Sequence, residues 1–132
     1  MPTVRHALTI LAVEDLARAA AFYDAAFGWP RAVDVPVYVE YQLPGSMRLG
    51  LYDRRGFGRN VGALPHPTPP GALAPTELYF HADDVAIADA ALVAAGASVL
   101  SPRAPRDWGD EAAYFGDPDG NVLVIARPLP QL

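Results

Sequence analysis

An internal repeat limits what this chain of 132 residues can fold into more than any other feature of its sequence. Residues 8–28 and residues 77–96 share one order of segments: an apolar run, an acidic residue, an alanine-rich amphipathic run and a glycine. The halves also end alike, at 44–53 and at 117–127, with a glycine-containing turn followed by an apolar run. Two copies of about seventy residues are too few for a solenoid, so we expect one domain, residues 1–132, built from two similar modules.

Each half carries the local signals of one helix. Asp15 is a favourable N-cap, and apolar side chains follow it at helical spacing until Gly28, which predicts a helix over 16–27. Asp84 begins a second amphipathic run and predicts a helix over 85–95.

Runs rich in strand-forming residues follow each helix, and an apolar strand precedes it. We expect the strands that come after the helices at 35–43, 47–53, 97–101, 111–116 and 121–127. The turn at 117–120, Asp-Pro-Asp-Gly, predicts a hairpin between the last two. The pattern is βαβββ twice, an α+β fold with modules at 1–53 and 77–132. Residues 54–76, rich in glycine and proline, are expected to be an irregular linker, a functional lid, or both.

Composition excludes several classes of function. The net charge of −5 argues against a nucleic-acid partner, because phosphate binding needs a basic face. No apolar run approaches the ~20 residues of a membrane span, and no signal peptide is read, so no membrane partner is expected. The absence of cysteine fits the reducing cytosol, and a cytoplasmic location is expected. The absence of lysine excludes a Schiff base and a P-loop lysine.

Three segments together resemble the vicinal oxygen chelate superfamily, which comprises glyoxalases, bleomycin resistance proteins and dioxygenases. They are LTILAVEDLARAAAFYDAAFGW at 8–29, ELYFHADDVAIADAALVAAGA at 77–97 and WGDEAAYFGDPDGNVLVIARP at 108–128. Their order, spacing and duplication cover both halves of the chain. The resemblance implies an open, cup-shaped mixed sheet with helices outside and a ligand inside, and a homodimer.

In that family a divalent metal is held by four inward side chains, one on the first and one on the last strand of each module. The corresponding positions here are Leu8, Gly50, Glu77 and Val124. Only the glutamate offers a donor atom, whereas Mg, Mn, Fe and Zn sites need several. We therefore expect neither a metal nor another cofactor. A displaced cluster of His6, Glu77 and His81 is the alternative.

Strand alternation predicts the lining of an apolar ligand site with a few polar groups. The expected ligand-binding residues are Leu8, Arg48, Tyr52, Glu77, Tyr79, His81, Trp108 and Val124. Glu77, a carboxylate on an apolar strand, is the candidate catalytic acid or base, or an anchor for a ligand cation. The other interpretation is a solvated strand start paired with an arginine. Trp108 is expected either to stack on an aromatic ligand or to pack against a partner subunit or the loop.

These observations favour a metal-independent small-molecule binding protein that sequesters a toxic or antibiotic aromatic compound. The alternative is a lyase, isomerase or dioxygenase-like enzyme on the same scaffold, using Glu77 as acid or base or a displaced metal. A regulatory or accessory domain is a third, weaker option. No Ser-His-Asp order or glycine-rich nucleophile turn supports covalent hydrolysis.

Overall fold

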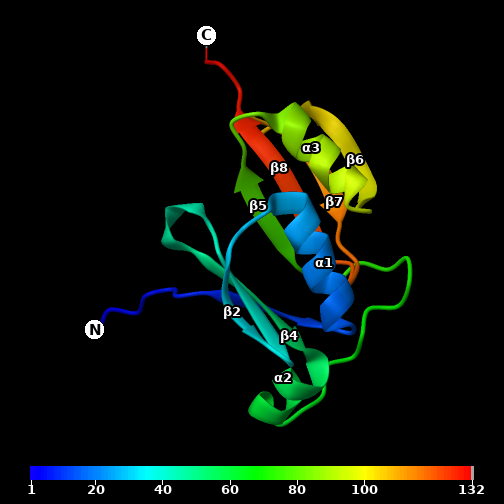
Figure 1. Cartoon of the computed structure of the whole chain (residues 1–132). Coiled ribbons are helices and arrows are strands. Elements are labelled where there is room, and N and C mark those ends of the chain that lie inside the picture. Colours follow the sequence, from blue (N-terminus) through cyan, green and yellow to red (C-terminus); the bar gives the residue numbers. More distant parts are fainter. Residues whose placement is uncertain (132) are drawn as a thin grey trace. The chain divides into compact units, whose positions relative to one another are not determined.

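The computed structural model describes residues 1–131 and shows an α+β protein with two four-stranded mixed sheets (Figure 1). The chain divides into two units. The first unit holds residues 1–20 and 29–67, and the second holds residues 21–28 and the chain from residue 68 onward. Helix α1 (Leu16–Phe27) contributes to both units.

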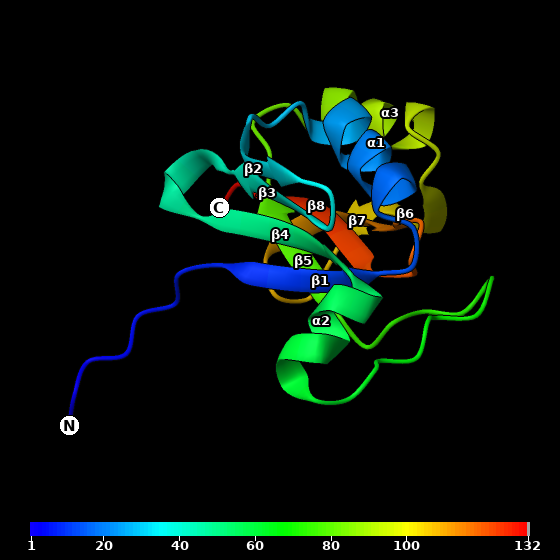
Figure 2. The same cartoon turned by 60° about the horizontal axis from the view of Figure 1, so that its bottom comes forward.

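The first unit contains a sheet with the strand order β1-β4-β3-β2 (Figure 2). Its strands are β1 (Thr9–Val13), β2 (Arg31–Val35), β3 (Tyr38–Gln42) and β4 (Arg48–Asp53). Strands β1 and β4 pair in parallel, and the other pairs are antiparallel. A short 3₁₀ turn, η1 (Pro44–Ser46), connects β3 to β4.

The second unit repeats this order as β5-β8-β7-β6. Its strands are β5 (Glu77–His81), β6 (Ser98–Pro105), β7 (Asp110–Gly116) and β8 (Val122–Pro128), and its complete helix is α3 (Val85–Ala94). The parallel pair is again formed by the first and last strands of the module. The predicted βαβββ order, the two helices and the hairpin at 117–120 are thus confirmed.

Two local expectations are wrong. The run 35–43 is not one strand, because a turn at Pro36 and Val37 separates β2 from β3. Segment 54–76 is not wholly irregular, because it begins with helix α2 (Arg54–Val61). The Asp53 side chain caps this helix by accepting a hydrogen bond from the Arg55 backbone N–H at 2.9 Å. The helix forms with this cap although it contains two glycines, which have poor helix propensity.

In the first sheet the strands alternate between a buried face and a more polar face, whereas the middle strands of the second sheet, β7 and β8, are buried on both faces. In the first unit the Tyr41 hydroxyl donates to the carbonyl of Ala20 at 3.0 Å, which ties β3 to the start of α1. The buried side chains of that sheet are Leu11, Val13, Val39, Tyr41, Leu49 and Leu51. In the second unit the corresponding buried side chains are Ala113, Phe115, Leu123 and Ile125. Side chains for a binding site must therefore come mainly from the opposite faces.

A buried carboxylate organises the turn between β7 and β8. Asp117, only 7% exposed, accepts hydrogen bonds from the backbone N–H groups of Asp119 at 2.9 Å and Asn121 at 2.8 Å. It also accepts from the Asn121 side-chain amide at 3.0 Å and from the Tyr23 hydroxyl at 2.6 Å. The side-chain oxygen of Asn121, Oδ1, accepts from the Thr76 hydroxyl at 2.6 Å. The turn is thereby joined to α1 and to the start of β5.

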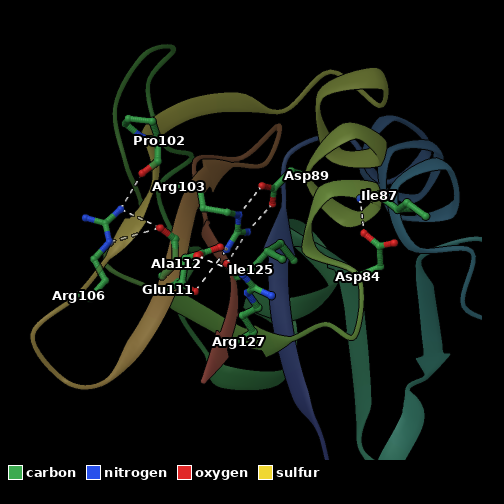
Figure 3. A network of polar contacts seen from close by, with 10 residues as sticks. All are labelled: Asp84, Ile87, Asp89, Pro102, Arg103, Arg106, Glu111, Ala112, Ile125 and Arg127. Carbon is green, nitrogen blue, oxygen red and sulfur yellow. Dashed lines mark hydrogen bonds and ion pairs between the residues drawn. The ribbon is translucent and has the colours of Figure 1, made fainter. Parts of the chain in front are cut away.

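A second polar network holds α3 to its sheet (Figure 3). The Arg103 guanidinium on β6 donates to the Asp89 carboxylate on α3 at 2.7 and 2.8 Å. It also donates to the backbone carbonyls of Glu111 at 3.3 Å and Ile125 at 2.9 Å. One arginine thus connects β6, β7, β8 and the helix. Among residues 1–131 no helix has both the length and the apolar character that a membrane crossing needs.

Tyr23→Phe should lower the free energy of unfolding by about 1–3 kcal/mol, because it leaves the buried Asp117 carboxylate without one donor. Urea denaturation of both proteins measures this loss. Tyr114→Phe is the matched control, since the Tyr114 hydroxyl makes no hydrogen bond within residues 1–131, and it should change stability by less than about 0.5 kcal/mol. Equal effects of the two changes would contradict the role assigned to Asp117.

Candidate functional site

In the first unit, the face opposite the buried side chains carries a polar cluster on β3 and β4. Register pairs Glu40 with Gly50, Tyr38 with Tyr52, and Gln42 with Arg48. The predicted residues Arg48 and Tyr52 therefore lie on one face. Leu8, also predicted for the site, directly precedes β1 and is half-buried.

Glu40 is the centre of this cluster and is only 6% exposed. Its two carboxylate oxygens accept separate hydrogen bonds, from the Tyr38 hydroxyl at 2.5 Å and from Arg48 Nη1 at 2.8 Å. Arg48 Nε donates to the side-chain oxygen of Gln42 at 3.2 Å. The guanidinium is thus held by two neighbours on β3.

The pKa values in this cluster move in opposite directions. The hydrogen bond from Tyr38, together with Arg48, lowers the pKa of Glu40 despite its burial. Burial, then the hydrogen bond to Glu40, raises the pKa of Tyr38. At neutral pH the carboxylate is ionised and the phenol is protonated, so neither group is suited to exchange protons with a ligand.

Gly50 makes the cluster possible. A Cβ atom at this position would lie 2.4 Å from the Tyr38 hydroxyl and 2.8 Å from two carbons of its ring. The tyrosine ring therefore lies over the glycine, with its centroid 5.2 Å from that of Tyr52. Only a residue without a side chain leaves this space.

In the second unit, the corresponding face has an apolar floor. Register pairs Val124 with Tyr79 on one side and with Tyr114 on the other. Val124, Ala112 and Ala126 are fully buried, and Tyr114 and Val122 pack against them. The predicted residue Val124 therefore contributes to the floor of the face and is itself covered.

The same sheet face and the turn before β7 carry a hydrogen-bonded aromatic group, which we call the Trp108 group: Tyr79, His81, Trp108 and Asp110. The Trp108 indole donates to the Tyr79 hydroxyl at 2.9 Å, and that hydroxyl donates to the Asp110 carboxylate. His81 Nε2 lies 3.5 Å from the same carboxylate oxygen, and the Tyr79 and His81 rings are 5.9 Å apart. Trp108 is 54% exposed and Tyr79 39%, so their ring surfaces are accessible. Partial burial, then the bond to Asp110, raises the pKa of Tyr79 and keeps it protonated.

Glu77 agrees with the second interpretation of the sequence, a solvated strand start, except for the arginine partner. Its side chain is exposed at the start of β5, opposite Val122, and makes no hydrogen bond or ion pair within residues 1–131. It is neither a desolvated carboxylate nor the partner of an arginine. The desolvated carboxylate on this face of the first sheet is Glu40, which sequence reasoning missed. The same alternation that selected Arg48 and Gly50 would have found it, because Glu40 lies between the apolar residues Val39 and Tyr41.

The residues at the family's four metal positions do not fit a divalent ion. Tyr38 fills the space over Gly50, and Val124 is buried among aliphatic and aromatic side chains. Leu8 offers no donor. In the part of the chain that the structure describes, no three His, Asp or Glu side chains form a group able to hold a metal. His6, a member of the alternative displaced cluster, bonds locally, with its Nε2 3.1 Å from the Thr9 hydroxyl.

The duplicated four-stranded sheets, each with a parallel pair of its first and last strands, define an α+β protein of two βαβββ modules. The family model described as Glyoxalase/Bleomycin resistance protein/Dioxygenase superfamily matches residues 3–125. The chain belongs to this superfamily, as its sequence predicted. No curated protein sequence matches it.

Solved structures share the fold over nearly the whole chain. A glyoxalase-related enzyme from Fulvimarina pelagi is 26% identical with a TM-score of 0.80, covering 92% of this chain and 86% of that one. A lactoylglutathione lyase from Agrobacterium tumefaciens is 26% identical with a TM-score of 0.71, covering 95% and 94%. A glyoxalase/bleomycin resistance protein/dioxygenase from Nocardioides is 20% identical with a TM-score of 0.79, covering 100% and 92%.

Glu40→Gln should destabilise the protein at pH 7 by about 1–3 kcal/mol, because it removes the charged acceptor of two hydrogen bonds. The folded pKa of Glu40 lies below its ordinary value of 4.5. Its contribution is therefore complete above that value and disappears as the pH falls through the lowered pKa. Urea denaturation at pH 7 and pH 3 should show the difference from the unaltered protein shrinking at the lower pH.

Glu77→Gln is the control for this measurement. Its side chain is exposed and has no partner within residues 1–131, so stability should change by less than about 0.5 kcal/mol at either pH. If Glu77→Gln were as destabilising as Glu40→Gln, the stabilising role assigned to the Glu40 hydrogen bonds would be wrong.

Proposed function

We propose that this protein binds a flat, aromatic small molecule without a metal, and that its role is to sequester a toxic or antibiotic compound of that kind. The observation that carries the proposal is the Trp108 group on the second sheet. It offers accessible indole and phenol rings beside an apolar floor, held in place because the Trp108 indole donates to the Tyr79 hydroxyl and that hydroxyl donates to Asp110. Rings held in place in this way stack on an aromatic ligand with little further loss of side-chain entropy.

Membership of the superfamily supports a small-molecule role, and the unsuitable residues at the metal positions support a role without a metal. An enzyme that uses Glu77 as acid or base is not favoured, because its side chain is exposed to solvent and has neither the burial nor, within residues 1–131, the charged partner typical of a catalytic carboxylate. Binding through the Trp108 group is therefore the better-supported function of the two.

Trp108→Phe should weaken binding of N-phenyl-1-naphthylamine, a neutral aromatic fluorophore, about 2- to 10-fold, because phenylalanine offers a smaller ring for stacking and loses the hydrogen bond to Tyr79 that holds the indole in place. Fluorescence titration of the probe measures the Kd. Ile87→Ala, a change of another exposed apolar side chain in the same unit, should leave the Kd unchanged. Equal affinities in the Trp108→Phe and unaltered proteins would rule out the Trp108 group as the site.

Metal dependence is checked in the same titration. Prior treatment with EDTA should leave the Kd for N-phenyl-1-naphthylamine unchanged. Stoichiometric Fe, Mn, Ni or Zn in the purified protein, with binding lost on its removal, would contradict the metal-independent role.

We further propose that the chain is a cytoplasmic homodimer. Support comes from the family resemblance and from the edge strands β2 and β6, each hydrogen-bonded to a neighbouring strand on one side only and so open to pairing. Sedimentation at micromolar concentration should show a dimer, and a monomer would refute this part of the proposal.

A further inference from the structure

Arg48 has hydrogen-bonding capacity that its own neighbours do not use. Its side chain is 46% exposed, and it donates through Nη1 to Glu40 and through Nε to Gln42. Nη2 makes no hydrogen bond within residues 1–131. A guanidinium whose remaining N–H groups face solvent is suited to accept an anion in a paired geometry.

The guanidinium is held before any ligand arrives. Glu40 is nearly buried and is itself fixed by the Tyr38 hydroxyl, which fits only because residue 50 is glycine. Gln42 holds the other side of the fork at 3.2 Å. An arginine fixed in this way loses less side-chain entropy on binding than a free surface arginine does.

Aromatic rings adjoin this arginine in the same unit. Tyr38 shares the Glu40 carboxylate with Arg48, and the Tyr52 ring lies 5.2 Å from the Tyr38 ring at an interplanar angle of 61°. Phe57 of α2 extends the row, 6.4 Å from Tyr52. A ligand held by Arg48 would thus have aromatic surface close to it.

We propose that this face of the first sheet is a binding site for an aromatic organic anion, whose carboxylate or sulfonate group is held by Arg48. The Arg48–Glu40 pair is neutral overall in a chain of net charge −5. The anchor therefore acts at short range through directed hydrogen bonds and adds little long-range attraction. The site lies within the first unit and does not depend on the Trp108 group.

Two fluorophores with the same aromatic body test this site. One is 1-anilinonaphthalene-8-sulfonate, and the other is N-phenyl-1-naphthylamine, which lacks the sulfonate. Arg48→Gln should raise the Kd of the sulfonate roughly 10-fold or more, the effect of a lost hydrogen bond to a charged group, and should change the Kd of the neutral probe less than about 2-fold. Arg48→Lys keeps the positive charge but loses the paired N–H groups of the guanidinium, so its Kd for the sulfonate should lie between those of the unaltered protein and Arg48→Gln.

Arg55→Gln is the matched control, because Arg55 is also exposed and ion-paired in this unit, with Asp53 at 3.4 Å. It should leave both Kd values unchanged. Equal losses of sulfonate binding in the Arg48→Gln and Arg55→Gln proteins, or equal weakening of both probes by Arg48→Gln, would overturn the proposal. If Arg48→Gln does not fold, as judged by circular dichroism, unaltered sulfonate affinity in Arg48→Lys would overturn it.

The outcomes separate this site from the function proposed above. If Trp108→Phe weakens binding of the neutral probe and Arg48→Gln leaves the Kd of the sulfonate unchanged, only the anion site is rejected. If Arg48→Gln weakens sulfonate binding and Trp108→Phe leaves the Kd of the neutral probe unchanged, only the Trp108 group is rejected.

Discussion

The Asp117 carboxylate is the interaction on which the second unit depends most. A carboxylate that is almost fully desolvated must have its oxygens satisfied, and here four donors satisfy them. Two of these donors are backbone N–H groups, so the carboxylate fixes the path of the turn. A third comes from Tyr23 on α1. This turn determines where β8 begins, and β8 supplies Val124 and Ala126 to the apolar floor beside the Trp108 group.

Gly120 shows how tightly this turn is specified. It has a φ of +82°, and a Cβ there would lie 2.6 Å from the carbonyl oxygen of Ala72. Its own carbonyl accepts a hydrogen bond from the Ala74 N–H at 2.9 Å. Residues 72–74 of the connecting segment are thus held against the turn, so this part of the long connection is fixed even though it has no regular structure.

The fold was predictable because it rests on periodic and local signals. The helix over 16–27 follows from Asp15, whose side chain accepts from the Arg18 N–H at 3.1 Å as an N-cap should. Helix α2 was missed because its interior contains Gly56 and Gly58, which weaken the sequence signal of a helix, although its caps are local. Gly56 is present for packing, since a Cβ there would meet the Tyr52 ring at 2.4 Å. A contact of this kind between Gly56 and the Tyr52 ring cannot be predicted from the sequence.

The candidate site was predictable only in part, for a related reason. Strand alternation identifies which residues share a face, and it placed Arg48 with Tyr52 and Tyr79 with His81. It does not say how much water reaches a side chain. Glu77 and Glu40 are both carboxylates on the more polar face of a strand, yet Glu77 is exposed and Glu40 is buried. Burial depends on neighbouring strands, and Tyr38 covers Glu40 only because Gly50 on the next strand leaves room.

The two modules place different chemistry on equivalent faces. Gly50 and Val124 occupy the same position in the two last strands, opposite Glu40 and Tyr114 respectively. In the first module the missing side chain admits a phenol, a carboxylate and a guanidinium, and the first strand offers the aliphatic Ile10 beside them.

In the second module a valine fills the corresponding position, and Ala112, Tyr114 and Ala126 replace the Tyr38, Glu40 and Tyr52 of the first. The polar and aromatic groups instead come from the first strand of that module, through Tyr79 and His81. One duplicated backbone thus carries an ionic anchor on one sheet and an aromatic surface on the other. The ionic anchor requires glycine at this strand position, because any Cβ there would meet the Tyr38 ring and displace it from Glu40.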